Sequence, residues 1–252
     1  MDLGYRALIA VLRLAFRWLG LRFRITGMRN VPDRGGAVLA INHTAHVDFI
    51  FAGYGVLKAN RRLVRFMAKK SIWQHPLAGR VMRMCRHIPV DRSAGAEGLT
   101  LAVEALEAGE LVGIYPEGTM SRAFEIKQPL KTGAVRMAQA TGTPVVPTIV
   151  WGAQRLWTKD HPQDFSRSHI PVHVAFGEPI RVGRDDDIAA ATVRLRAAMV
   201  VLLDEVIADY PAMSGDDLGF QPARLGGTAP TPADAYDRDL ADSRRTTDEW
   251  TR

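Results

Sequence analysis

The stretch Gly36-Ala37-Val38-Leu39-Ala40-Ile41-Asn42-His43-Thr44-Ala45-His46-Val47-Asp48 decides the fold of this chain. Its first half is a short apolar run that ends in polar residues, which is typical of a strand buried on both faces of a sheet. Its second half places a histidine and an aspartate just beyond the carboxyl end of that strand. Open α/β sheets bind their ligands at this edge. The stretch therefore predicts an α/β protein with its chemistry where the strand ends.

Apolar runs and helical periodicity alternate along most of the chain. Runs at residues 111–115, 145–150 and 172–176 end in turn residues, as strands do. Alternating strands and helices are typical of α/β layered domains. We therefore expect one catalytic domain over residues 23–212, with a central mixed sheet flanked by helices. The helices are expected at residues 47–57, 76–84, 99–108, 133–141 and 188–209, and a further short strand at 88–92.

An amphipathic helix is expected to precede this domain, within residues 1–22. Residues 8–19 are almost all apolar, but Arg13 and Arg17 interrupt them, so the segment does not supply the roughly 20 apolar residues of a membrane-spanning helix. At about 100° per residue, Arg6 falls within about 40° of these two arginines on the helix surface. A wide apolar face with a narrow arginine stripe is typical of a helix that lies in a membrane interface.

Two interpretations of this helix stay open. Its apolar face can lie in the membrane, with Trp18 at the level of the lipid headgroups, or it can pack the helix onto its own domain. Arg22 and Arg24, which follow the helix, favour the membrane. The segment has no small-residue cleavage site, so we expect no cleaved secretory leader.

Charge and composition divide the chain in two. Residues 213–252 contain five arginines and eight acidic residues, with few aliphatic side chains, and they predict a disordered or loosely attached tail. Residues 1–212 hold 28 basic and 19 acidic residues. This excess favours an anionic partner, which could be nucleic acid, anionic lipid or a phosphorylated substrate. The single cysteine, Cys85, excludes an internal disulfide and suits a reducing cytosolic setting.

His43 and Asp48 form the main candidate for catalysis. If His43 lies in the turn after the strand and Asp48 in the first helical turn, the carboxylate can fix the imidazole tautomer and leave the other ring nitrogen free to accept a proton. No GxSxG nucleophile motif occurs, so that proton would come from a substrate hydroxyl or from water. Two alternatives remain: a metal site that includes His46, and a histidine that only caps the following helix.

A second polar turn follows the apolar run at 111–115. It reads Tyr115-Pro116-Glu117-Gly118-Thr119-Met120-Ser121-Arg122. Backbone amides in such a turn, together with Thr119, Ser121 and Arg122, can hold a phosphate group. Between the two turns, the strand at 88–92 ends in Asp91 and Arg92, a pair that on a surface is usually only solvated.

Four motifs, in this order and spacing, resemble the four conserved blocks of the glycerolipid acyltransferases. Among these enzymes, the chain is similar to the bacterial 1-acyl-sn-glycerol-3-phosphate (lysophosphatidic acid) acyltransferases, and the resemblance spans roughly residues 25–180. The motifs are Asn42-His43-x4-Asp48, Ile88-Pro89-Val90-Asp91-Arg92, Tyr115-Pro116-Glu117-Gly118-Thr119 and Val145-Val146-Pro147.

The resemblance implies a role for each block. It implies a general base, His43, that is oriented by Asp48 and takes the proton of the acceptor's sn-2 hydroxyl. The acyl side would be shaped by Val146 and Pro147. The acceptor's phosphate and glycerol would be bound by a larger set: Asp91, Arg92, Glu117, Gly118, Thr119, Ser121, Arg122 and Lys131.

The resemblance also implies the partners and the location. The donor would be acyl-CoA or acyl carrier protein, and the acceptor a lysophospholipid that becomes phosphatidic acid in phospholipid biosynthesis. No metal, organic cofactor or nucleic acid is expected. The enzyme would work at the cytoplasmic face of the cell membrane as a peripheral or monotopic protein, held there by residues 1–22.

The sequence departs from the family pattern where the acceptor binds. Met120 stands where the third block commonly has arginine, and the second block commonly has Gly and Phe in place of Arg86 and Pro89. Lys127 and Lys131 could replace the lost charge. Another lyso-lipid or glycolipid therefore remains an alternative acceptor, and a thioester hydrolase could use the same His–Asp pair with water.

Overall fold

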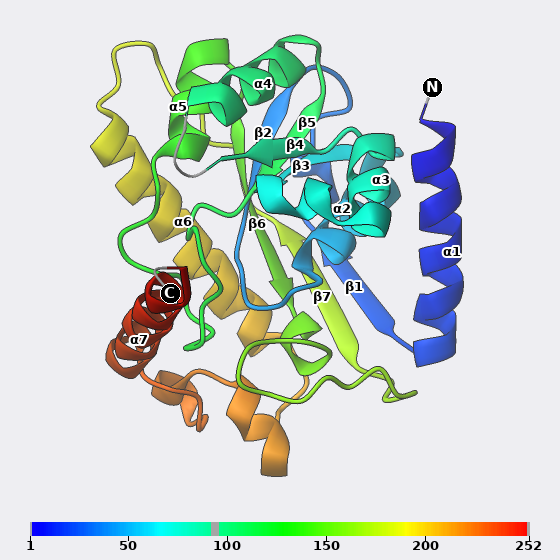
Figure 1. Ribbon diagram of the computed structural model, residues 1–252, viewed down its shortest axis with the longest axis vertical. Helices are drawn as coiled ribbons and strands as arrows, with labels where there is room; N and C mark the ends of the chain where they lie inside the picture. The colour runs from blue at the N-terminus through cyan, green and yellow to red at the C-terminus, as the bar shows by residue number, and fades with distance from the viewer. Residues whose placement is uncertain (1, 92–95, 251–252) are drawn as a thin grey trace.

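Strand β2 (Ala37–Ile41) is buried along its whole length and lies in the middle of a seven-stranded sheet. The computed structural model describes residues 2–91 and 96–250. The strand order is β1-β7-β6-β2-β5-β3-β4; β6 and β7 are antiparallel and all other neighbours are parallel (Figure 1). The other strands are β1 (Arg22–Thr26), β3 (Val64–Lys69), β4 (Ile88–Val90), β5 (Leu111–Ile114), β6 (Val145–Trp151) and β7 (Pro171–Phe176).

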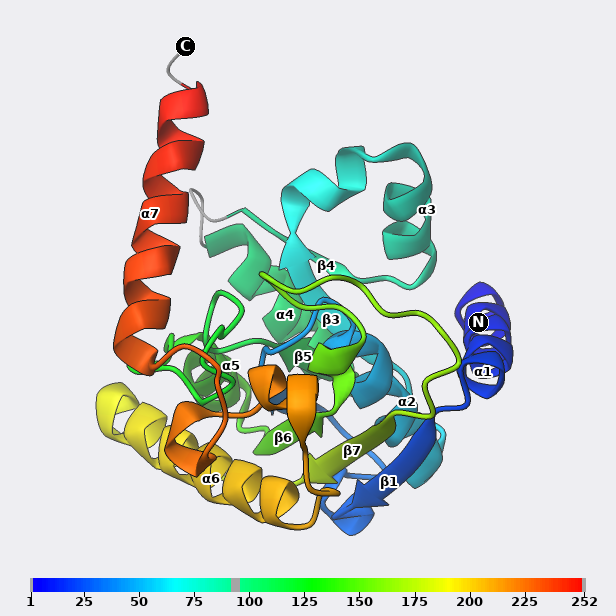
Figure 2. The ribbon, with the colours of Figure 1, turned by 90° about the horizontal axis from the view of Figure 1, so that it is seen from below.

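Helices cover both faces of this sheet, because alternate residues of the buried strands point to opposite sides. Val38 and Ala40 face one apolar core and Leu39 and Ile41 face the other. The first core is closed by α4 (Ala96–Glu107), α5 (Gly133–Thr141) and α6 (Ile188–Ala208), and the second by α1 (Leu3–Leu19) and α2 (Asp48–Asn60) (Figure 2). The remaining helices are α3 (Pro76–Met84), α7 (Pro232–Trp250) and the short 3-10 helices η1 (Met28–Asn30), η2 (Lys70–Gln74), η3 (Ala153–Arg155), η4 (Gly215–Phe220) and η5 (Ala223–Leu225).

This architecture confirms the predicted α/β class, the mixed sheet and the N-terminal helix. Strands β1 and β3 were missed, since arginines interrupt the apolar pattern of both. Arg24 of β1 is ion-paired with Asp209 at 2.5 Å, so this arginine, which favoured the membrane interpretation, instead contacts the end of α6. Arg65 of β3 is buried and is ion-paired with Glu110.

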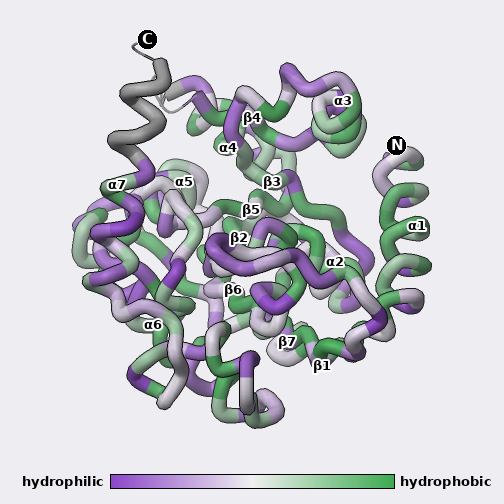
Figure 3. The backbone as a smooth tube through the Cα atoms, turned by 60° about the horizontal axis from the view of Figure 1, so that its bottom comes forward, coloured by the Kyte–Doolittle hydropathy of each residue, from purple (hydrophilic) through white to green (hydrophobic). Residues whose placement is uncertain are grey.

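Helix α1 packs on its own domain and also leaves apolar side chains exposed. Its inner side packs on the domain through Tyr5, Phe16 and Leu19, which are all buried. Its outer side is also apolar: Leu14 and Trp18 are 67% and 65% exposed, and Figure 3 shows a largely hydrophobic helix. None of the helices that the structure describes combines the length and apolar character needed to cross a bilayer.

Residues 213–252 were predicted to form a disordered or loosely attached tail. In the structure, η4, η5 and α7 lie within this segment, and it contacts the domain through ion pairs and through Phe220, whose ring centroid is 6.3 Å from that of Phe124. Arg155 pairs with Asp217 at 2.7 Å, and Arg224 with Glu125 at 2.9 Å. The prediction rested on the small apolar area of this segment. Ion pairs between residues far apart in sequence leave no local pattern, so they were not foreseen.

Candidate active site

The end of β2 is fixed by a side chain that extends the sheet. Asn42 is fully buried, and its carboxamide accepts a hydrogen bond from the Val150 N–H at 2.7 Å and donates one to the Val150 carbonyl at 3.0 Å. An asparagine thus replaces a backbone pair between β2 and β6. Because both bonds are buried, they hold the next residue, His43, in a defined place at the carboxyl edge of the sheet.

His43 and Asp48 face each other across the turn between β2 and α2. His43 Nδ1 lies 3.3 Å from Asp48 Oδ2, so the Nε2 atom is the ring nitrogen left for a substrate. Asp48 is the first residue of α2, and the N-cap is Val47, which rules out His43 as the helix cap. The imidazole also stacks on Tyr115, with ring centroids 3.9 Å apart.

Backbone N–H groups of the turn between β2 and α2 hold the Asp48 side chain in place. Its Oδ2 accepts hydrogen bonds from the N–H groups of Thr44 at 2.8 Å and Ala45 at 2.7 Å. The side chain is completely buried, and this burial raises the pKa of Asp48 although the hydrogen bonds act in the opposite direction. A buried carboxylate beside an imidazole stabilises the imidazolium that forms when the ring accepts a proton.

The Glu117 side chain links the two polar turns by hydrogen bonds. Its two carboxyl oxygens accept hydrogen bonds from the backbone N–H of His43 at 2.7 Å and of Lys127 at 3.0 Å. The side chain is buried, and burial raises the pKa of Glu117 to about 8. In this structure Glu117 therefore positions the His43 loop, whereas the resemblance implied contact with the acceptor.

Gly118, Thr119 and Ser121 follow Glu117 in the second polar turn, near His43. Gly118 has φ +74°, a left-handed conformation that favours glycine, and Lys131 side-chain carbons lie 3.5 Å from where its Cβ would be. The hydroxyl of Thr119 accepts a hydrogen bond from Lys127 Nζ at 2.7 Å. Ser121 is buried, and its N–H donates to the His43 carbonyl at 2.7 Å. The two turns are thus bonded to each other at His43.

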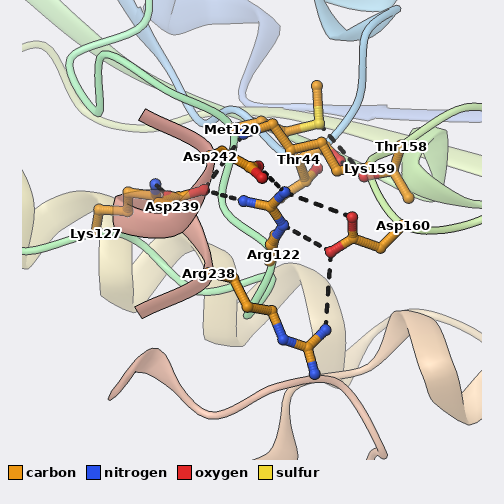
Figure 4. Close-up of polar contacts among 10 residues, drawn as sticks. All are labelled: Thr44, Met120, Arg122, Lys127, Thr158, Lys159, Asp160, Arg238, Asp239 and Asp242. Atoms are coloured by element: carbon orange, nitrogen blue, oxygen red, sulfur yellow. Dashed lines mark hydrogen bonds and ion pairs between the residues drawn. The ribbon is translucent and has the colours of Figure 1, made fainter. Parts of the chain in front are cut away.

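Arg122 lies in the same turn, but carboxylates already surround its guanidinium group. It pairs with Asp160 at 2.6 Å and, from α7, with Asp239 and with Asp242 at 2.5 Å (Figure 4). Its side chain is only 6% exposed. Met120, at the position where the family commonly has arginine, is buried, and its sulfur lies 3.4 Å from the Thr158 hydroxyl oxygen.

The remaining predicted residues are less closely involved. Asp91 follows β4 and is partly buried, and Arg92 lies outside the described residues. Val146 and Pro147 are buried in β6, in register with Leu39 and Ala40 of β2, so they pack within the sheet. Their acyl-side role stays a prediction.

The metal interpretation has no support in the arrangement of side chains. The exposed His46 packs against Trp157, with ring centroids 4.6 Å apart. Within residues 2–91 and 96–250, no three His, Cys, Asp or Glu side chains form a group able to hold a metal ion.

Sequence reasoning missed a role for Tyr115 and for Lys159. A signal for Tyr115 existed: it follows β5, which is parallel to β2, so the ends of both strands meet at one edge. No such signal existed for Lys159, which lies in a loop after η3. It is brought to the site because the hydroxyl of Thr158 donates to the Thr44 carbonyl at 2.6 Å.

Comparison with known proteins agrees with this geometry. The family model named Acyltransferase matches residues 22–151. The chain is 35% identical over 130 residues to a 1-acyl-sn-glycerol-3-phosphate acyltransferase of Bacillus subtilis, with 51% of this chain and 62% of that protein aligned. It is 25% identical over 166 residues to a protein of the same name from Borreliella burgdorferi, with 63% of this chain and 62% of that protein aligned.

A solved structure shares the fold. It is the crystal structure of the 1-acyl-sn-glycerophosphate acyltransferase PlsC from Thermotoga maritima, with a TM-score of 0.65 and 22% identity over 82% of this chain and 81% of that chain. The chain spans about three fifths of the length of the curated relatives named above. Because the family model covers more than half of the sequence, the chain belongs to the Acyltransferase family.

Proposed function

We propose that this protein transfers a fatty acyl chain from a thioester, acyl-CoA or acyl carrier protein, to the sn-2 hydroxyl of lysophosphatidic acid. The observation that carries this proposal is the His43–Asp48 pair at the carboxyl edge of β2, beside a cluster of basic side chains. The names of the Bacillus subtilis and Borreliella burgdorferi relatives support the same acceptor.

The geometry suits proton transfer by one imidazole. With its Nδ1–H directed to Asp48, the neutral ring of His43 accepts the hydroxyl proton at Nε2. The alcohol oxygen then forms a C–O bond to the thioester carbonyl carbon, and the C–S bond breaks. The imidazolium returns its proton to the leaving thiolate, so the ring is neutral again after each turnover.

Basic side chains near His43 suit an acceptor with a phosphate group. Lys127 lies beside Thr119 and Lys131 beside Gly118, and Arg122 belongs to the same turn as Thr119 and Gly118. A phosphate group binds most strongly where several cationic donors converge. These side chains therefore favour lysophosphatidic acid over a neutral glycolipid acceptor.

An apolar cavity beside the first turn of α2 suits the fatty chain. It has a volume of about 210 Å³ and lies between α1, α2 and α3. Phe49 and Ile50, which directly follow Asp48 in α2, line it together with Leu8, Leu12 and Phe16 of α1. Burying a hydrocarbon chain there contributes about 0.8 kcal/mol for each methylene group.

The outer side of α1 suits attachment to a membrane. At about 100° per residue, the exposed Leu14 and Trp18 lie on the side of the helix opposite to the buried Tyr5 and Phe16. The exposed Arg13 lies between the two sides, where it can reach lipid phosphates. We propose that this side holds the enzyme at the cytoplasmic face of the membrane as a peripheral or monotopic protein.

The test of catalysis compares His43→Ala with wild type. We expect the purified wild type to make phosphatidic acid from an acyl thioester and lysophosphatidic acid, and the variant to be slower by about 10²–10⁴-fold, the usual contribution of a general base. The control is His46→Ala, an exposed histidine three residues away, which should keep its activity. Loss of thioester without any diacyl product, across a panel of lyso-lipids and glycolipids, would instead identify a hydrolase.

The test of membrane attachment compares two matched variants. Leu14→Glu with Trp18→Glu places two charges on the outer side of α1 without touching its packed side, and we expect a clear loss of co-sedimentation with anionic vesicles. The control is Val193→Glu on α6, since Val193 is 68% exposed, much like Leu14. Equal sedimentation of both variants would refute attachment through α1.

A further inference from the structure

One carboxylate of α7 contacts three cations of the domain. Asp239 Oδ1 faces Arg122 and, at 3.3 Å, Lys159, while its Oδ2 lies 2.5 Å from Lys127 (Figure 4). Arg122 and Lys127 come from the loop between β5 and α5, and Lys159 comes from the loop after η3. Although partial burial opposes its ionisation, Lys127 and Lys159 hold the pKa of Asp239 below its ordinary value. Convergence of three cationic donors on one anion is the arrangement that binds a phosphate group.

These cations also adjoin the catalytic turn. Arg122 follows Ser121, whose N–H donates to the His43 carbonyl, and Lys159 follows Thr158, whose hydroxyl donates to the Thr44 carbonyl. The N–H of Lys127 shares the carboxylate of Glu117 with the N–H of His43. An anion that replaced Asp239 would therefore lie close to the loops that hold His43 in place.

The helix that supplies Asp239 is attached mainly by charge over residues 232–242, where the structure describes its side chains. Ala235, Asp239 and Asp242 are spaced by four and three residues, so they share one side of α7. Ala235 is its buried apolar side chain among the described residues, whereas Tyr236 is 64% and Leu240 38% exposed. An element with so little apolar contact opens at a small cost in free energy.

We propose that Arg122, Lys127 and Lys159 form a binding site for a phosphate monoester, and that α7 occupies this site in the free protein. Asp239 takes the place of the phosphate, and Asp242 adds a second negative charge on Arg122. The acceptor must displace α7 before its phosphate binds. This inference rests on the proposed function for the source of the phosphate group, and it adds a competitor that is built into the chain.

The experiment measures phosphate binding without catalysis. Calorimetric titration with glycerol 3-phosphate tests a soluble phosphate monoester, and co-sedimentation with phosphatidylcholine vesicles, with and without phosphatidic acid, tests a lipid headgroup. Asp239→Asn with Asp242→Asn removes both competing charges. We expect this variant to bind at least one of the two forms about tenfold more tightly than wild type, because the open state no longer has to be populated against α7.

Three comparisons decide the outcome. Asp237→Asn removes an exposed charge from the same helix and should leave binding unchanged. Lys159→Ala should weaken binding in the double-variant background; the partly exposed lysine can be removed without opening the core. The proposed role of α7 is wrong if the double variant binds both phosphate forms no more tightly than wild type and no more tightly than Asp237→Asn. Tight binding without acyl transfer would refute the proposed function and leave the phosphate site standing.

Discussion

The two terminal helices lie on opposite sides of the molecule, and both are tied to it by a buried arginine (Figures 1 and 2). Arg65 of β3 pairs with Asp2, just before α1, at 3.0 Å and also with Glu110. Arg122 pairs with Asp239 and Asp242 of α7. The two arginine side chains are equally inaccessible, at 5% and 6% exposure.

The helices differ in what else holds them. Phe16 of α1 packs against Phe23, Phe51 and Tyr54, with ring centroids 5.2 to 5.4 Å apart. The described part of α7 has no comparable aromatic contact and buries Ala235. Since apolar burial contributes far more free energy than partly exposed ion pairs, α1 is a fixed part of the fold and α7 is a removable cover.

The largest effect is expected where α1 packs. Phe16→Ala should lower the free energy of unfolding by about 3–5 kcal/mol, because it removes a buried aromatic ring and leaves a cavity. Trp18→Ala, on the exposed side of the same helix, should change it by less than about 0.5 kcal/mol. Urea denaturation measures both values. Similar losses for the two variants would mean that α1 does not pack as the structure shows.

A smaller effect on the free energy of unfolding is expected from the titration of the buried Glu117. Its folded-state pKa of about 8 lies above its ordinary value of 4.5, so between these values the folded state holds a proton that the unfolded state has lost. The free energy of unfolding should therefore fall as pH rises through this window, by about 1.4 kcal/mol for each pH unit.

Glu117→Gln provides the control for this pH dependence. Glutamine cannot titrate, so the variant should lose the slope between pH 5 and 8, whatever its absolute stability. The measurement is the urea midpoint of both proteins at several pH values. Parallel curves for wild type and variant would show that Glu117 is ionised in the folded protein.

The smallest effect is expected when α7 is removed. Deleting residues 232–252 should lower the free energy of unfolding by less than about 1 kcal/mol, because the described part of α7 is attached mainly by partly exposed ion pairs. Thermal denaturation of the shortened and full-length chains measures the difference. A loss as large as that of Phe16→Ala would show that α7 belongs to the core and cannot act as a removable cover.

Much of the fold and the catalytic pair could be predicted from the sequence because their signals are local. The run at residues 37–41 is apolar at every position, so it had to be a buried strand. His43 and Asp48 are only five residues apart, and a strand-to-helix turn brings them within 3.3 Å. The apolar faces of α1 follow from its periodicity.

Only the tertiary structure decided the surroundings of that pair. Arg122 and Asp239 are 117 residues apart, and Asn42 and Val150 are 108 apart. A charged or polar side chain has the same appearance in sequence whether it faces water or a distant partner. Apolar periodicity records which face of an element is buried, whereas polar pairing depends on which elements the fold brings together. The sequence therefore determined the α/β core and the proposed catalytic pair, and the tertiary structure determined that a polar tail covers the cluster of basic side chains.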